Sequence, residues 1–247
     1  MSGKKTLCAA SAVVRGLALV LLSSLVNACS SQPPSTRSAA NGAARAKPSA
    51  PATPRPAYAE ADASYYRARA SALATEAMDE VAGTDFWRFR RGRLYVPDAS
   101  NIWELEARLA DAAKNESAAG VVDATSAILL SDQADINAHT LRGAALRKTD
   151  HVSDADFHDS VAKSLVDSII HAGDGRSAKS AWTAYRVKEE YEVLKALGSR
   201  FVSQSRITEG NRSFDVLDAE KVADGSKLRF YFDVTEALAE EARAAAH

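Results

Sequence analysis

Cysteine is scarce in this chain, which has only Cys8 and Cys29 among its 247 residues. Cys8 lies in an N-terminal segment that we expect to be removed, so the mature chain could form no internal disulfide. The sequence also lacks a Gly-x-Ser-x-Gly elbow, a His-Glu-x-x-His pair, a Cys-His arrangement and a dinucleotide-binding glycine fingerprint. With five histidines and no usable thiol, these absences argue against a nucleophilic enzyme, and we expect no cofactor.

Acidic residues are missing from residues 1–57, which carry seven lysines and arginines. The remainder holds all 32 acidic residues and 24 of the 31 basic ones, a formal charge of about −8 from Tyr58 onward. An acidic body argues against nucleic-acid binding. Four of the early basic residues lie between 29 and 57, where we interpret them as solubilising; contact with anionic lipids or cell-wall polymer is the alternative.

Long apolar runs are absent as well. Gly16–Val26 is too short to span a bilayer as a stop-transfer helix, and it follows a basic start with Lys4 and Lys5. The run closes on Val26-Asn27-Ala28-Cys29. This order of a basic start, a short apolar core and a cysteine after small or polar residues is typical of an export signal.

The signal resembles those of bacterial lipoproteins, in which the cysteine becomes the lipidated first residue. The resemblance implies a signal peptide over residues 1–28, a lipid anchor on Cys29 and a membrane as partner. Ser30 resembles the class sorted to the outer membrane, which implies the periplasmic face of that membrane. Val26 and Asn27 depart from the commonest form of the signal. An ordinary secretory signal, with Cys29 left as a free thiol, is the alternative.

Proline is concentrated after the expected anchor, because six of the seven prolines fall between Gln32 and Ala57 among Ala, Ser and Thr. The segment has no aromatic residue and no aliphatic one larger than alanine, so it cannot build a core. We predict a disordered linker over residues 29–57 that holds a folded body away from the membrane.

The first part of the body, residues 58–172, has the apolar periodicity of helices. Ser153 and Asp156 have capping-box spacing, and small residues recur 35 positions apart, at Gly120 and Ala155. This spacing resembles the tetratricopeptide repeat, which implies stacked antiparallel helical hairpins. The predicted helices are Tyr58–Ala82, a short one from Asp85, Ile102–Lys114, Ser117–Leu130, Ile136–Arg147 and Ser153–Ile170.

The second part, residues 173–247, alternates apolar and polar residues as strands do. We predict strands at 183–187, 201–208, 213–217 and 227–234, the last three forming an antiparallel meander with turns at Glu209-Gly210-Asn211 and Asp224-Gly225. Helices are expected over Glu189–Leu197 and Glu236–Ala246. The fold class is thus mainly α with a small α+β unit.

An ordered series of residues between Asp85 and Val234 resembles the bacterial family called domain of unknown function 4919. Phe89 stands where leucine is expected, and the family implies this architecture but no activity. The residues that carry the resemblance are Asp85-Phe86, Phe89-Arg90, Gly173–Ser177, Ala184–Val187, Glu189–Tyr191, Leu194, Leu197-Gly198, Gln204, Asp215 and Tyr231-Phe232.

Two short segments could contact a ligand or partner. In Gly173–Ser177, Asp174 and Arg176 could meet an anion or cation, although a helix C-cap at Gly173 followed by a turn explains the pattern better. In Phe86–Arg93, Trp87 and Arg90 could suit a membrane surface or polyanion, although packed aromatics and ion-paired arginines are the simpler reading.

Three further candidates have simple structural readings. Glu190 could take part in acid–base chemistry, but acids at a helix start are favoured by the helix dipole. Asp154 and His158 are four residues apart and could share a metal ion, but zinc needs more ligands; we expect no metal site. Trp182, or else Trp87 or Trp103, could serve as a stacking platform.

The function that these features favour is a tethered, non-enzymatic protein-interaction or scaffold module in the cell envelope, which binds a protein or peptide in a groove of the hairpins. The first alternative is a binding module for a small molecule or cell-wall glycan. The second is a carboxylate-dependent hydrolase that uses residues such as Asp174 and Glu190.

Overall fold

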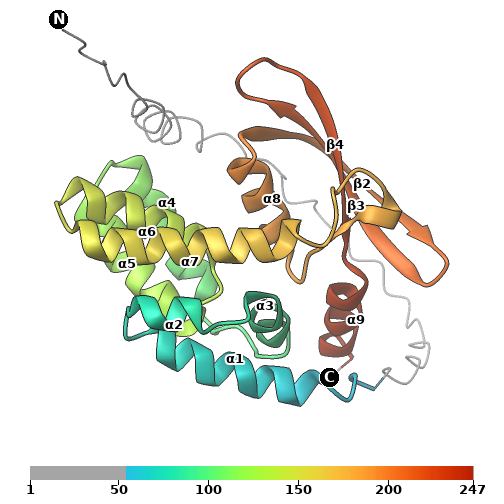
Figure 1. Cartoon of the computed structure of the whole chain (residues 1–247), viewed down its shortest axis with the longest axis horizontal. Helices are drawn as coiled ribbons and strands as arrows, with labels where there is room; N and C mark the ends of the chain where they lie inside the picture. The colour runs from blue at the N-terminus through green and yellow to red at the C-terminus, as the bar shows by residue number, and fades with distance from the viewer. Residues whose placement is uncertain (1–53, 247) are drawn as a thin grey trace, which may run out of the picture.

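The computed structural model describes residues 54–246, in which helices form one side of the molecule and a small sheet the other (Figure 1). Side chains of Asp85, Ser117 and Asp135 each accept a backbone N–H at a helix start, as N-caps do. No helix in this range is long and apolar enough to cross a membrane. The helical side consists of α1 Ala59–Leu73, α2 Met78–Ala82, α3 Phe86–Leu94, α4 Ile102–Lys114, α5 Ala118–Ser131, α6 Ile136–Lys148 and α7 Val152–Ile170.

The single helix predicted over Tyr58–Ala82 is wrong, because the chain breaks between α1 and α2. Glu76 has φ of 54°, in the left-handed region that no helix continues through. Arg69 on α1 then bonds Glu80 on α2 at 2.7 Å and Thr84 at 3.0 Å, so α2 folds back beside α1. Tertiary contacts here override the helix propensity of an alanine-rich stretch.

The capping box predicted at Ser153 and Asp156 is also wrong. Helix α7 begins one residue earlier, at Val152, and its N-cap is His151, whose side chain makes no capping bond. Asp156 instead accepts a hydrogen bond from Arg147 on α6 at 2.5 Å. The carboxylate therefore joins two helices rather than closing the start of one.

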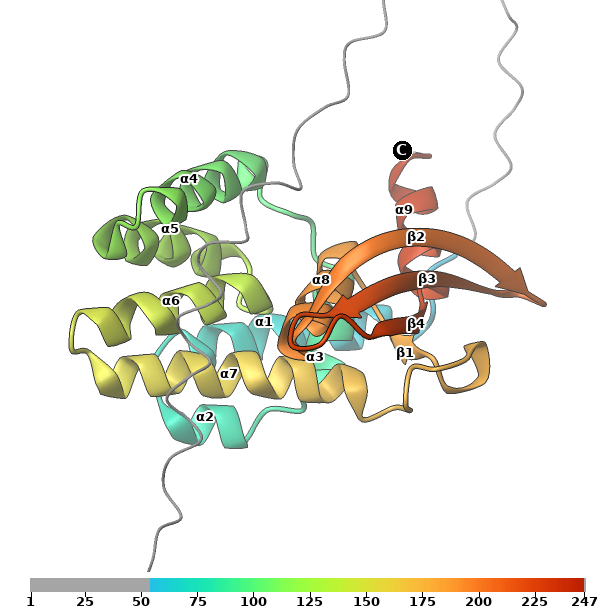
Figure 2. The ribbon, with the colours of Figure 1, turned by 90° about the horizontal axis from the view of Figure 1, so that it is seen from above.

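The predicted antiparallel hairpins are present, with α4 to α7 packed successively against one another (Figure 2). Leu105 and Leu109 of α4 pack on Ile128 of α5 and on Ala138 of α6 in one apolar cluster. The tetratricopeptide-like repeat itself stays a prediction.

The sheet has the order β1-β4-β3-β2, and its last three strands form the predicted antiparallel meander. Gly210 and Gly225, with φ of 62° and 70°, occupy the predicted turns. β1 runs parallel to β4, and β2 is an edge strand. The elements are the 3-10 helix η1 Ala178–Ser180, β1 Trp182–Thr183, α8 Val187–Ala196, β2 Ser199–Glu209, β3 Arg212–Lys221, β4 Lys227–Asp233 and α9 Thr235–Ala244.

Two details near the start of this unit differ from the predictions. The predicted strand 183–187 ends after Thr183, since Val187 begins α8 and Arg186 is held by a buried carboxylate described below. Gly173 is not the C-cap of α7, which is His171. A Cβ on Gly173 would lie 2.3 Å from the carbonyl oxygen of Ser180, so glycine is needed for a close approach of two backbones.

One hydrophobic core joins the helices to the sheet. It contains Phe89 and Leu165 from the helical side together with Trp182, Leu194 and Phe232 from the other. Helix α8 lies between the sheet and α7 (Figure 2). The strands therefore depend on the helices for burial of their inner face, as expected for a small sheet with little core of its own.

Helices α1 and α3 approach so closely that Gly92 cannot carry a side chain. A Cβ there would lie 2.1 Å from the backbone oxygen of Asp62. We expect Gly92→Ala to lower the free energy of unfolding by roughly 2–4 kcal/mol, because two backbones must move apart. Gly83→Ala is the matched control, since its Cβ would meet nothing closer than 3.4 Å. Urea unfolding measures both; equal small effects would contradict the close α1–α3 contact.

Candidate functional site

A fully buried ion pair joins the helical side to the base of α8. Arg90 on α3 donates from Nε and one terminal nitrogen to the two carboxylate oxygens of Glu189 at 3.1 and 2.8 Å. It also donates to the carbonyl of Thr183 at 2.8 Å and lies over the ring of Tyr185. Burial would raise the pKa of Glu189, but Arg90 outweighs it and lowers the pKa below its usual value. Both groups are charged and mutually neutralised.

A second buried carboxylate, Asp132, lies in the turn between α5 and α6 and gathers three cations. It is paired with Arg186, with Arg93 Nε at 3.1 Å and with Lys188 Nζ at 3.4 Å. Burial alone would raise the pKa of Asp132, but the three cations lower it instead. We call Asp132, Arg93, Arg186 and Lys188 the Asp132 network. It ties α3, the α5–α6 turn and α8 together.

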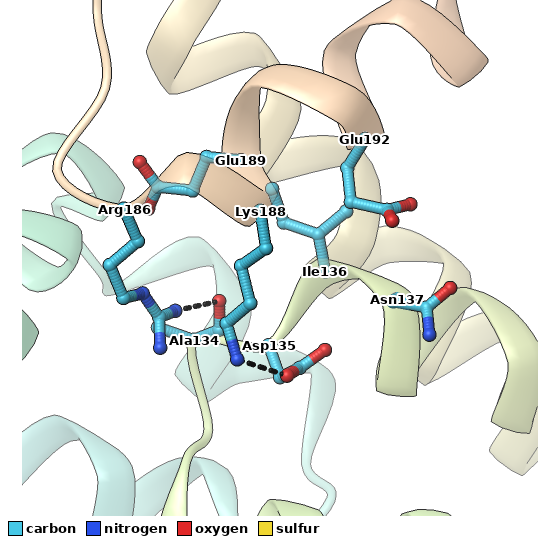
Figure 3. A pocket seen from close by; sticks show the side chains of 8 residues that line it. All are labelled: Ala134, Asp135, Ile136, Asn137, Arg186, Lys188, Glu189 and Glu192. Atoms are coloured by element: carbon cyan, nitrogen blue, oxygen red, sulfur yellow. Dashed lines mark hydrogen bonds and ion pairs between the residues drawn. The ribbon is translucent and has the colours of Figure 1, made fainter. Parts of the chain in front are cut away.

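A small pocket opens beside this network, between the start of α6 and the first turns of α8 (Figure 3). Arg186 donates to the carbonyl of Ala134 at 3.0 Å, and Lys188 donates to Asp135 at 2.6 Å. Both cations of the pocket are thus ion-paired inside the protein. Its cavity of about 10 Å³ lies far below the range of roughly 300–1,000 Å³ typical of small-molecule sites. The remaining lining residues are Ile136, Asn137, Glu189 and Glu192.

Glu190 of α8 faces the sheet and differs from the other buried carboxyl groups among residues 54–246 in its lack of hydrogen-bond partners. It is fully buried, and neither of its carboxylate oxygens has a hydrogen-bond partner. Asp215 on β3, also fully buried, accepts from Arg206 at 2.6 and 2.9 Å and from Gln204 at 2.8 Å. Burial first, and the charge of Asp215 second, raise the pKa of Glu190 to about 8. At neutral pH Glu190 is therefore mainly in its protonated, neutral form.

The other predicted site residues do not meet at one place. Asp174 accepts from the Arg176 backbone at 2.9 Å and the Ser180 hydroxyl at 2.5 Å, while the Arg176 guanidinium lies over the Phe230 ring. Trp182 is buried, stacked on Phe230, and donates to the Gly173 carbonyl at 2.9 Å. These contacts close the 173–181 loop against the sheet.

The arginine-rich segment on α3 is absorbed into the fold. Arg88 and Arg91 both bond the buried carboxylate of Asp62, at 2.7 and 2.5 Å. Arg91 also lies over the ring of Trp87, which remains 41% exposed. The segment therefore presents an aromatic edge rather than four unpaired cations.

Cys29 lies outside the described residues. Asp154 is exposed while His158 is buried, so the two do not face one site. Among residues 54–246, no group of three or more acids, histidines or cysteines is placed to hold a metal ion.

Sequence reasoning missed Asp132 and Arg186 altogether. Asp132 sits in a short turn between two helices, where an acid is ordinary, and only the fold shows that it is buried. A weak signal was present in Arg186-Val187-Lys188, where two cations stand directly before the acidic pair Glu189-Glu190.

The family comparison agrees with the predicted resemblance. Residues 95–243 match the family model described as domain of unknown function (DUF4919), more than half of the chain, so the chain belongs to this family. The match begins after α3, which leaves Asp85-Phe86 and Phe89-Arg90 outside it. No curated protein and no solved structure matches the chain.

Removal of one partner from the Arg90–Glu189 pair should be strongly destabilising. We expect Arg90→Met to cost about 3–5 kcal/mol, because Glu189 is left charged and buried. The control is Arg212→Met, which removes the partner of Asp233 at a half-exposed site and should cost at most about 1 kcal/mol. Denaturant unfolding of both variants checks this, and a similar small loss in both would contradict it.

Glu190→Gln should remove part of the loss of stability that accompanies a rise in pH. Because the pKa of Glu190 is higher folded, about 8, than unfolded, 4.5, its contribution is complete at low pH and declines as the pH rises between these values. Glutamine cannot ionise, so the variant should gain on the wild type by on the order of 1 kcal/mol per pH unit from pH 5 to 8. Urea unfolding across this range measures the gain; parallel pH profiles would show that Glu190 is ionised when folded.

Proposed function

We propose that this protein is an envelope lipoprotein whose folded part serves as a non-enzymatic protein-interaction or scaffold module. Fatty acid on Cys29 would anchor it, at the periplasmic face of the outer membrane. The observation that carries the proposal is that the buried charged groups are paired with one another. Arg90 is paired with Glu189, and Asp132 is paired with Arg93, Arg186 and Lys188. Groups that could do chemistry on a substrate are thereby committed to holding the fold.

The surface supports a role in binding. Exposed apolar side chains occur on the hairpins, with Trp103 of α4 at 66% exposure and Leu130 of α5 at 87%. Glu106, one turn beyond Trp103, lies 3.7 Å from Lys188 of α8, so this side of α4 faces the pocket. Exposed apolar groups beside a polar rim are typical of interaction sites.

The two alternatives each rest on one observation. A small molecule or glycan would use the exposed ring of Trp103, but this ring does not line the small pocket between α6 and α8. A carboxylate-dependent hydrolase would use the protonated Glu190, but this group has no exposed surface. We therefore favour a protein partner.

Anchoring is tested by metabolic labelling with an alkyne fatty acid and mass spectrometry of the mature N-terminus. We expect an acylated peptide that begins at Cys29, and Cys29→Ser should abolish the label. A mature chain that begins elsewhere, or a Cys29 without acyl groups, would contradict the proposed anchor.

Partner binding is tested by a photo-crosslinking amino acid placed in living cells at Trp103 or Leu130, with Val222 as the control. Val222 is 61% exposed but lies after β3, away from the hairpins. We expect one discrete crosslinked protein from the hairpin positions and none from Val222. No crosslink, or the same products from all three positions, would count against a partner in the hairpin groove.

A further inference from the structure

Two buried histidines face each other between α6 and α7. His139 is 0% and His158 2% exposed, and their Nδ1 atoms are 2.8 Å apart. Arg142 Nε lies 2.7 Å from Nε2 of His158, and Nε2 of His139 lies 3.1 Å from the carbonyl oxygen of Gln133. We call this chain of groups the imidazole relay.

The distances fix where each proton lies. Arg142 can only donate, so Nε2 of His158 must accept and its proton must lie on Nδ1. That proton is donated to Nδ1 of His139, whose own proton lies on Nε2 and is donated to Gln133. Every hydrogen bond of the relay is satisfied when both imidazoles are neutral, and no acceptor is left for another proton.

The relay holds several elements together. Arg142 also donates to α5, to the carbonyl of Val122 at 3.0 Å and to the hydroxyl of Ser126 at 2.6 Å. The Gln133 end belongs to the turn beside Asp132, where the Gln133 N–H donates to Tyr66 at 3.2 Å. The relay thus spans α5, α6, α7 and the turn that carries the Asp132 network.

The charged groups around the relay come from three elements. Arg142 of α6 opposes a positive charge on His158, while Glu76, in the α1–α2 turn, lies 3.5 Å from both His158 Nε2 and Arg142. Asp132 and Asp135 of the α5–α6 turn favour a charged His139. Burial nevertheless dominates, and it lowers the pKa of His139 to about 4 and that of His158 to about 3.

We propose that the imidazole relay is an acid-sensitive lock, which holds α5, α6 and α7 together when both rings are neutral and releases them on acidification. A proton on His139 would set Nδ1–H against Nδ1–H, and one on His158 would set Nε2–H against Arg142. Either event breaks a link of the chain and places a charge in the interior. The lock does not depend on the proposed anchoring or partner.

The first test is the protonation state of each ring in the full chain, read from ¹⁵N chemical shifts. We expect the Nδ1–H tautomer for His158 and the Nε2–H tautomer for His139, both unchanged between pH 7 and 5. The exposed His151 and His171 serve as internal references for the chemical shifts. An Nε2–H tautomer at His158, or protonation of either relay ring between pH 7 and 5, would overturn the proposal.

The second test is the pH dependence of unfolding. Since both folded pKa values lie below the unfolded 6.5, stability is complete above this pH and is lost as the pH falls through it. Two such groups raise the unfolding constant about 100-fold per pH unit below pH 6. His139→Asn keeps an acceptor for His158 but removes one titration, so the rise should be about tenfold smaller. His151→Gln should keep the wild-type slope, and an unchanged slope in His139→Asn would overturn the lock.

Discussion

The architecture depends on the burial of opposite charges between α3, the α5–α6 turn and α8. Arg90 with Glu189, and Asp132 with Arg93, Arg186 and Lys188, are removed from water together. Such groups are costly to bury alone and gain little over an apolar core when paired. These pairs determine how the elements are arranged, because a displacement of α8 would leave several charges unpaired in the interior. The sheet, which shares its core with the helices through α8, is thereby held in one position.

The interior also contains groups that are neutral because of where they lie. Glu190 keeps a proton that an exposed glutamate would lose, and the two relay histidines lack protons that exposed ones would gain in mild acid. The linked effects on stability have opposite signs. Glu190 weakens the fold as the pH rises, and His139 with His158 weaken it as the pH falls. Because the two ranges of pH overlap, these groups together favour an intermediate pH.

Local patterns predicted most of the elements, because hydrophobic periodicity and turn residues act over a few neighbours. Ile102–Lys114 was predicted with the bounds that α4 has, and the glycines at 210 and 225 correctly marked the hairpins. The break before α2 and the short β1 were not predicted, because contacts between residues that are not neighbours in the sequence determine them. Arg69 with Glu80, and Arg186 with Asp132, are long-range contacts that override the local preference.

The candidate site was predictable only in part. Glu190 and Arg90 were singled out on sequence grounds, but their burial, and hence their proton and charge states, come from the packing of α8 on α3 and the sheet. The His139–His158 contact joins two residues nineteen positions apart on neighbouring helices, and no pattern along the chain distinguishes these histidines from the exposed ones. Trp182 looked like a surface platform because a tryptophan beside polar residues gives no sign of the strand that covers it.

Whether buried charge pairs position α8 can be measured by a double-mutant cycle at Arg90 and Glu189. The unfolding free energies of the wild type, Arg90→Met, Glu189→Gln and the double variant give the coupling between the two side chains. We expect a coupling of about 2 kcal/mol or more, with the double variant less destabilised than the sum of the singles. Additive effects would contradict it, since they would mean that the two groups stabilise the fold independently.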